Sequence, residues 1–123
     1  MPEYQITLDE YLAQLPRTRV MDWSTSIAAA AGVNLSAGRL LALRTLAEHP
    51  AGLTDFELAE ITGRQQTSIG KRRGELYDAG LVEAATNERG EIVKRPSPSG
   101  ALSIVWRITA LGLQYLEVRD TID

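Results

Sequence analysis

The residues of this sequence that are best suited to chemistry are polar and basic side chains in its second half. Cations and hydroxyl or amide donors bind phosphate oxygens, and Lys, Arg and Gln also hydrogen-bond to base edges in the major groove of DNA. The side chains of this kind are Arg64, Gln65, Gln66, Thr67, Ser68, Lys71, Arg72, Arg73, Arg89, Lys94 and Arg95. We predict that this set contacts double-stranded DNA.

The distribution of charge agrees with such a surface. The whole chain has a net charge of −3, but residues 64–107 hold eight bases and five acids, a surplus of three positive charges. The rest of the chain holds five bases and eleven acids. Positive charge gathered in one region is what binding to a polyanion requires. Because the surplus is modest, an ordinary solvated surface is the alternative interpretation.

Few residues offer any other chemistry. The sequence has no cysteine, which excludes disulfides and thiolate metal sites, and its one histidine, His49, precedes Pro50 at an expected helix end. A cation at that position caps the helix. The segment 63–70 lacks the pattern of a phosphate-binding P-loop. We therefore predict no enzyme activity, no cofactor and no metal site.

Length and hydropathy bear on the number of domains and on the location of the protein. The chain of 123 residues corresponds to one domain. It has no apolar run approaching the ~18 residues of a membrane span, and residues 1–5 lack the pattern of a signal peptide. We expect a cytoplasmic protein without a membrane segment.

Two short helices joined by a tight turn are expected to position the candidate residues. Thr54 and Glu57 form a capping box at the start of the first helix, and Gly63 ends it. The second helix runs from about Gln65 to Ala79. In a known DNA-docking unit of this kind, the second helix enters the major groove.

The second helix has a buried and an outward side. At ~100° per residue, Ile69 and Leu76 share the buried side. Arg72 and Arg73 lie at its two margins, with guanidinium groups that reach outward. The opposite side carries Thr67, Lys71, Gly74 and Asp78. Glycine costs about 0.5–1 kcal/mol in a helix interior, so Gly70 and Gly74 indicate either close approach of a groove or partner, or tolerated neutral positions.

Further helices and a hairpin complete the expected order. We predict helices over residues 7–15, 24–31 and 35–49, and a final helix capped by Thr109. A strand over 81–86, a turn over 87–90 and a loop over 96–100 lead to a half-buried strand. Its predicted inward residues are Leu102, Ile104, Trp106 and Ile108, which alternate with outward Ser103, Val105 and Arg107. The predicted fold class is mainly α with a small β-hairpin (α+β).

Two segments resemble winged helix-turn-helix regulators, including the MarR-like ones. Arg72-Arg73-Gly74-Glu75-Leu76, which leads into Ala79-Gly80-Leu81-Val82, resembles the end of their recognition helix, and Val105-Trp106-Arg107-Ile108-Thr109 resembles their returning strand. The resemblance covers about residues 34–118. It implies an N-terminal helical extension over 1–33, a winged helix domain over 34–118 and a tail over 119–123.

The resemblance also implies roles for the candidate residues. The outward helix residues Gln66, Thr67, Ser68, Lys71 and Arg72 would bind DNA, whereas Arg73 has a structural alternative beside Glu75 or a helix end. A wing over about residues 87–100 would contact the backbone or the minor groove, with Arg95 as its favoured base.

A third segment resembles small proteins of actinobacteriophages and prophages. Asp22-Trp23-Ser24-Thr25-Ser26, followed by Ala29-Ala30, is similar to a D-P-x-T-S-x-x-A-A segment that precedes their winged helix, with Trp23 in place of proline. The resemblance implies a regulator of phage or prophage type in the cytoplasm of a bacterial host.

Three functions and two assemblies stay open at this point. The leading interpretation is a transcriptional regulator that binds DNA as a homodimer. The alternatives are a winged helix that docks on a host or replication protein, and an accessory factor that bends DNA during excision or replication. The apolar stripe of Leu8, Tyr11, Leu12 and Leu15 predicts either a dimer interface or packing onto the last helix of the same chain.

Overall fold

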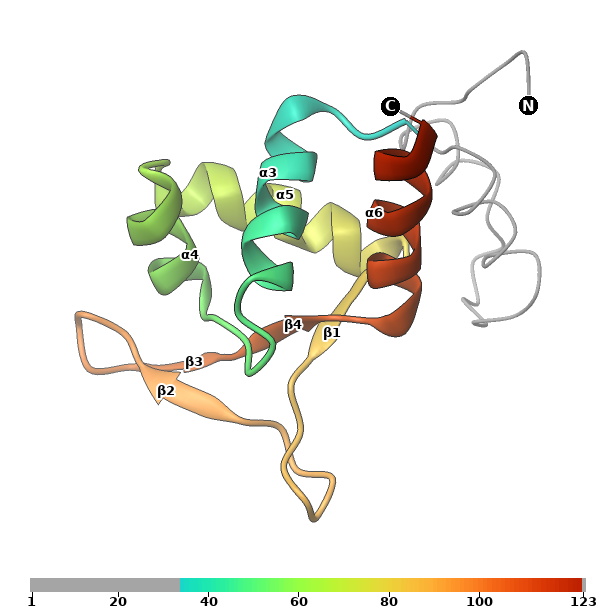
Figure 1. Cartoon of the computed structure of the whole chain (residues 1–123). Helices are drawn as coiled ribbons and strands as arrows, with labels where there is room; N and C mark the ends of the chain where they lie inside the picture. The colour runs from blue at the N-terminus through green and yellow to red at the C-terminus, as the bar shows by residue number, and fades with distance from the viewer. Residues whose placement is uncertain (1–33, 123) are drawn as a thin grey trace.

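A computed structural model describes residues 34–122 (Figure 1). Its elements, in chain order, are α3 (Ala37–Ala47), α4 (Asp55–Thr62), α5 (Gln66–Asp78), β1 (Val82–Ala84), β2 (Lys94–Pro96), β3 (Leu102–Ile104), β4 (Trp106–Ile108) and α6 (Ala110–Ile122). This order confirms the predicted α+β fold class. The helices expected at 7–15 and 24–31, the stripe from Leu8 to Leu15 and the phage-like segment 22–30 lie outside the described residues.

Four helices, α3 to α6, pack around one apolar core, to which α4 contributes Leu58. In Figure 1, α3 and α6 stand beside each other and α5 crosses behind α3. The core includes Leu43 and Leu46 of α3, Ile69 and Leu76 of α5, and Tyr115 of α6, each at most 2% exposed. The prediction that Ile69 and Leu76 face the core is therefore confirmed.

The last helix, α6, is tied to α3. It continues to Ile122, so residues 119–122, which we had assigned to a tail, belong to a helix. Arg44 of α3 donates two hydrogen bonds to the carboxylate of Asp120, at 3.2 and 2.7 Å. The hydroxyl of Tyr115 accepts a hydrogen bond from the Leu35 N–H at 3.3 Å. Both contacts hold α6 against the segment that contains α3, and the contact of Asp120 does so beyond residue 118.

A small sheet lies beneath the helices. β1 and β4 pair antiparallel, with Val82 opposite Ile108. Leu53, just before α4, exchanges two backbone hydrogen bonds of 2.8 Å with Trp106 on β4. The start of α4 is thereby fixed to the same strand that follows the hairpin.

The long connection from β1 to β4 contains a second antiparallel pair, β2 and β3, with Lys94 opposite Ile104. We had expected a loop from Pro96 onwards, but Pro96 ends β2. Proline has no backbone N–H, and this position of the strand does not require one. The next cross-strand hydrogen bond comes from the Ser97 N–H, which donates to the Ala101 carbonyl at 2.7 Å. The connection shows two tips in Figure 1, one at residues 87–91 and one at 97–101.

The predicted strand over 102–108 is broken, and its expected alternation was wrong at two positions. Val105, predicted to face outward, is fully buried, and Leu102, predicted to face inward, is 66% exposed. The Val105 N–H donates to the Val93 carbonyl, and the Val105 carbonyl accepts from the Ala85 N–H. The chain changes partner at this residue, from β2 to β1, so a single two-residue period does not run through it.

Candidate nucleic-acid interface

The turn between α4 and α5 exposes the start of α5. Gly63 adopts a left-handed backbone conformation (φ 72°) that ends α4, and its N–H donates to the Ala59 carbonyl at 2.9 Å. Arg64 and Gln65, which follow in the turn, are both exposed. The second helix therefore begins at the surface, as the sequence predicted.

The first turns of α5 present polar side chains and free backbone donors. Thr67, Ser68 and Lys71 are exposed, whereas Gln66 is half-buried in a cleft that Phe56 also lines. The N-cap residue Gln65 makes no side-chain capping hydrogen bond, and the first turn contains no acidic residue. The positive end of the helix dipole is therefore open to an anion.

Arg73 does not reach outward from α5 as we had expected. Its guanidinium donates two hydrogen bonds to the carboxylate of Asp55 at the start of α4, at 2.9 and 2.7 Å. The same group lies over the ring of Trp106, 4.0 Å from the centroid, and the Tyr77 ring meets that indole edge-on at 5.5 Å. Only 17% of the Arg73 side chain is exposed. Arg73 thus joins α5, α4 and β4.

Arg72 also contacts an acid. Its guanidinium lies 3.1 Å from the carboxylate of Glu75, which is 2.8 Å from the guanidinium of the buried Arg39 in α3. The Arg72 side chain is 27% exposed, so it does not reach outward as freely as we had predicted. Glu75 holds both arginines at the boundary between α3 and α5.

Arg95, the favoured base of the predicted wing, is bound to the start of α4. It donates hydrogen bonds of 3.0 and 2.7 Å to the carboxylate of Glu57 and one of 2.9 Å to the Gly52 carbonyl. The hydrogen bond from Arg95 lowers the pKa of the Glu57 carboxyl, and the Thr54 N–H adds to that effect. Glu57 in turn completes the predicted capping box with Thr54. Arg95 is therefore held between β2 and α4.

Comparisons with known proteins bear on this arrangement. No protein-family model matches the chain, and no curated protein matches it in sequence. Its structure is similar to a MarR family transcription regulator (20% identity, TM-score 0.53), covering 80% of this chain and 56% of the other. The fold is a MarR-like winged helix.

Two further solved structures share this winged helix. A possible transcriptional regulator from Methanosarcina mazei Go1 is 8% identical with a TM-score of 0.51, and covers 80% of this chain and 77% of its own. The protein RV1404 from Mycobacterium tuberculosis is 21% identical with a TM-score of 0.51, at 80% and 64% coverage. The chain thus spans about three fifths of the first and third of these neighbours. In this fold, α4 and α5 form the helix-turn-helix and residues 87–100 the wing.

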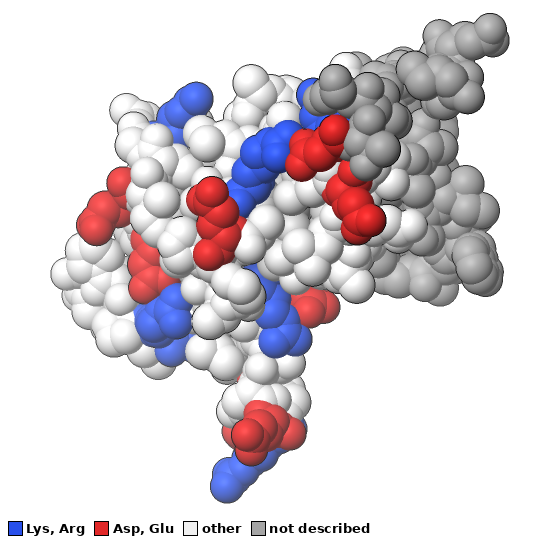
Figure 2. All heavy atoms as spheres, in the orientation of Figure 1, with Lys and Arg blue, Asp and Glu red and all other residues white. Residues whose placement is uncertain are grey.

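The wing carries two exposed bases. Arg89 lies at the tip formed by residues 87–91, where Glu88 and Glu91 are also exposed. Lys94 is exposed on β2. Figure 2 shows blue and red together on the arm that projects from the body of the molecule. The first tip is therefore not a purely basic surface.

The eight bases of residues 64–107 fall into two groups. Arg72, Arg73, Arg95 and Arg107 form ion pairs with Glu75, Asp55, Glu57 and Glu83. Arg64, Lys71, Arg89 and Lys94 are exposed, and none of them forms an ion pair within residues 34–122. The structure thus separates the candidate set into bases that hold the fold and bases that face solvent.

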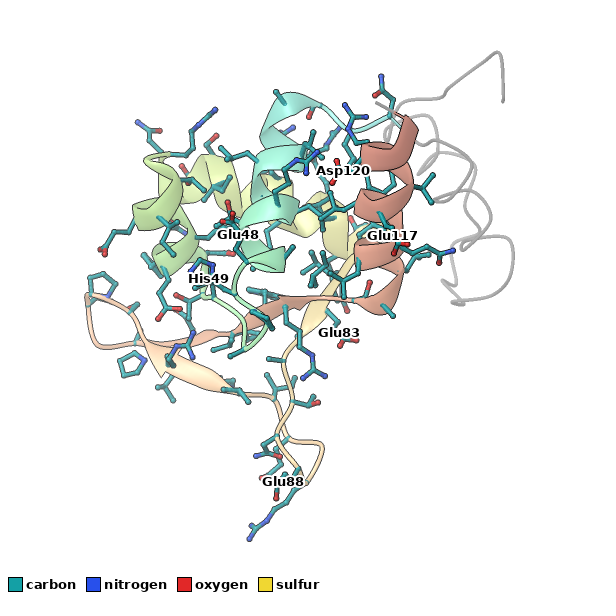
Figure 3. All side chains as sticks on the ribbon, viewed as in Figure 1. Glu48, His49, Glu83, Glu88, Glu117 and Asp120 are labelled. Carbon is teal, nitrogen blue, oxygen red and sulfur yellow. The ribbon has the colours of Figure 1, made fainter. Side chains whose placement is uncertain are left out.

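The acidic residues and the histidine of the described part of the chain were the remaining candidates for a metal site. In Figure 3, the labelled residues Glu48 and His49 lie together at the end of α3, Glu117 and Asp120 lie on α6, Glu83 lies on β1, and Glu88 lies far from them on the projecting arm. No group of three or more acidic or histidine residues within 34–122 is placed to hold a metal ion. His49 contacts the Thr45 carbonyl through Nδ1 at 2.9 Å. None of the helices in this part of the chain is long and apolar enough to cross a membrane.

Sequence reasoning missed three residues that organise this surface. Asp55 was not recognised as the partner of Arg73, Trp106 was not placed beneath the guanidinium, and Arg39 was not expected to be buried. One signal was available for Asp55, because acids in the first turn of a helix are placed to attract nearby cations. The contacts of Trp106 and Arg39 depend on how separate elements pack, which no local pattern encodes.

Proposed function

We propose that this protein is a sequence-specific transcriptional regulator that binds double-stranded DNA with α5 in the major groove. The wing would lie against the backbone or the minor groove beside it. This role corresponds to a protein of the cytoplasm. The resemblance of residues 22–30 to a phage segment favours a regulator of phage or prophage type.

The observation that carries this proposal is the open first turn of α5. Thr67, Ser68 and Lys71 project from a helix start that has neither an acid nor a side-chain cap. Backbone donors and a helix dipole attract phosphates there, and Lys71 has the length to reach a phosphate or a guanine edge.

We also propose that the protein acts as a homodimer. The four exposed bases of residues 64–107 give a limited electrostatic contribution, since binding to phosphates grows with the number of neutralised charges. Two copies of α5 on half-sites about 34 Å apart would double that contribution.

The test begins with selection of duplexes by the full-length protein from a random pool. The selected and random duplexes are then titrated with protein at several salt concentrations, where each phosphate contact adds about 0.9 to the slope. Lys71→Ala is expected to weaken binding to the selected duplex by about 5- to 150-fold, the value of one base contact. The melting temperature should change little, because Lys71 is exposed.

Matched variants separate specific contacts from general charge. Arg44→Ala removes the same charge from the α3–α6 surface and should bind nearly as the parent does. In the wing, Lys94→Ala should lower the salt slope by about one, whereas Arg95→Ala should leave it unchanged, because Arg95 is bound to Glu57. If Lys71→Ala binds the selected duplex like the parent, α5 does not read DNA and the proposal fails.

A specific observation favours a second function, docking on a host or replication protein. Ile92 of the wing and Leu102 of the adjoining β3 are 51% and 66% exposed, and Glu88 and Glu91 stand at the first tip of the wing. Exposed apolar side chains and acids suit a protein partner better than a phosphate backbone. Absence of salt-dependent binding to any duplex would favour this function over DNA binding.

A further inference from the structure

The two glycines within α5 have different surroundings. An added Cβ at Gly70 would lie 3.0 Å from a carboxylate oxygen of Asp55, the partner of Arg73. A side chain at Gly70 would therefore disturb the ion pair that joins α4 to α5. An added Cβ at Gly74 would meet no atom within 4 Å.

Nothing within residues 34–122 thus requires glycine at position 74. Its φ is not in the left-handed region, so alanine would fit the backbone. Alanine would also favour the helix, because glycine in a helix interior carries a larger entropic cost. The protein therefore lacks a side chain at Gly74, on an open surface, although alanine there would make the helix more stable.

The missing side chain lies on the outward side of α5. Thr67, Lys71 and Gly74 follow one another at intervals of four and three residues, and therefore lie in one line along the helix. Thr67 and Lys71 are exposed, and both are residues of the proposed DNA contact. Any ligand that covers these two side chains also approaches Gly74.

The dimensions of the major groove explain why a missing side chain at Gly74 would affect binding. A helix with its side chains is about 10–12 Å across, and the major groove is about 12 Å wide and 8.5 Å deep. A helix that enters the groove has almost no spare width, so side chains on its leading side limit how deeply it sits. Without a Cβ at Gly74, α5 can approach the floor of the groove more closely.

Resting on the proposed function, we propose that Gly74 is a positioning residue that sets the depth of α5 in the major groove. The close approach at Gly74 brings Thr67 and Lys71 within reach of base edges. Contacts to phosphates need no such depth. Gly74 therefore contributes to recognition of the specific sequence and not to general attraction to DNA.

The experiment uses Gly74→Ala and Gly74→Leu in the full-length protein, with the selected duplex and a random duplex as probes. Gly74→Ala should raise the melting temperature yet weaken binding to the selected duplex about tenfold, the scale of one lost base contact. Gly74→Leu should weaken it further. Binding to the random duplex and the salt slope should stay as in the parent, because no charge changes.

Gly38→Ala is the matched control. Gly38 lies in α3, and an added Cβ there meets the Arg72 stem at an ordinary contact distance of 3.5 Å. This variant should keep the affinity of the parent for both duplexes. Parent-like binding of the selected duplex by Gly74→Ala would overturn the inference, as would a lowered melting temperature. If Lys71→Ala also binds like the parent, the proposed function itself has failed; loss in Lys71→Ala alone refutes only the role of Gly74.

Discussion

A single tight turn joins α4 to α5, yet the starts of the two helices are built in opposite ways. α4 begins with the capping box of Thr54 and Glu57 and has two acids, Asp55 and Glu57, in its first turn. Arg73 and Arg95 bind those acids. α5 begins with no side-chain cap and has no acid in its first turn.

This difference shows how the fold divides similar residues between structure and function. Arg73 and Lys71 are two positions apart on one helix, but only Arg73 has a carboxylate within reach. The acids of α4 hold bases from α5 and from the wing, and thereby fix both elements to one helix start. Arg72 and Arg107 find partners outside α4, in Glu75 and Glu83. The bases that face solvent are those that form no ion pair within residues 34–122.

The largest expected effect comes from removing a core side chain from the buried side of α5. Leu76 is fully buried on the side of α5 that faces the core. Leu76→Ala should lower the free energy of unfolding by about 2–5 kcal/mol through the cavity it leaves, measured by urea denaturation. Ile69→Ala should act in the same range. Neutral results for both would mean that the outward side of α5 has been misplaced.

The buried side of α5 and the capping box of α4 could be predicted because each depends on a short, regular spacing. Ile69 and Leu76 follow the helical period, and Thr54 and Glu57 follow the three-residue spacing of a capping box. The partners of the arginines could not be predicted in this way. Asp55 and Arg73 are 18 positions apart, Glu57 and Arg95 are 38 apart, and their meeting depends on the packing of whole elements.

The wing shows the same limit at the level of the backbone. Alternation predicts a strand only while the strand keeps one partner, and the chain exchanges β2 for β1 at Val105. Leu102 and Val105 consequently face the opposite way from the prediction. Lys94 faces solvent while Arg95 binds Glu57, because adjacent residues of a strand such as β2 point to opposite faces.

The second prediction tests whether the acids of α4 serve the fold. Asp55→Ala would leave the guanidinium of Arg73 without its carboxylate in a site where 17% of the side chain is exposed. We expect a loss of about 1.5–3 kcal/mol in the free energy of unfolding, the range for hydrogen bonds to charged groups. The double variant Asp55→Ala, Arg73→Ala should recover part of it. A parent-like Asp55→Ala would contradict the structural role of Arg73.

The third prediction compares the two helix starts directly. The Thr54 hydroxyl accepts a hydrogen bond from the Glu57 N–H at 3.2 Å, so Thr54→Ala should cost about 1 kcal/mol. Gln65→Ala at the equivalent position of α5 should cost far less, because the Gln65 side chain makes no capping bond. Thermal denaturation of both variants measures the difference. Equal losses would show that α5 is capped after all.

The smallest expected effect is a pH dependence that belongs to the start of α4. The hydrogen bond from Arg95 holds the pKa of Glu57 below its ordinary value of 4.5 in the folded protein. A carboxyl whose pKa is lowered by folding adds stability above its unfolded pKa, and that contribution is lost as the pH falls through the folded pKa. Between about pH 5.5 and 3, the parent should therefore lose more stability than Glu57→Gln.

The effect should be modest, because the Glu57 and Arg95 side chains are 38% and 39% exposed and water weakens their attraction. Urea denaturation at a series of pH values measures it. The cause can be isolated by repeating Glu57→Gln in an Arg95→Ala background, where the two curves should run closer to parallel since the main source of the lowered pKa is gone. If Arg95→Ala leaves the acid sensitivity of Glu57 unchanged, Arg95 is not bound to α4 in solution. Arg95 would then be available, like Lys94, to bind DNA. The division into paired and solvent-facing bases would hold for the bases of α5 but not for those of the wing.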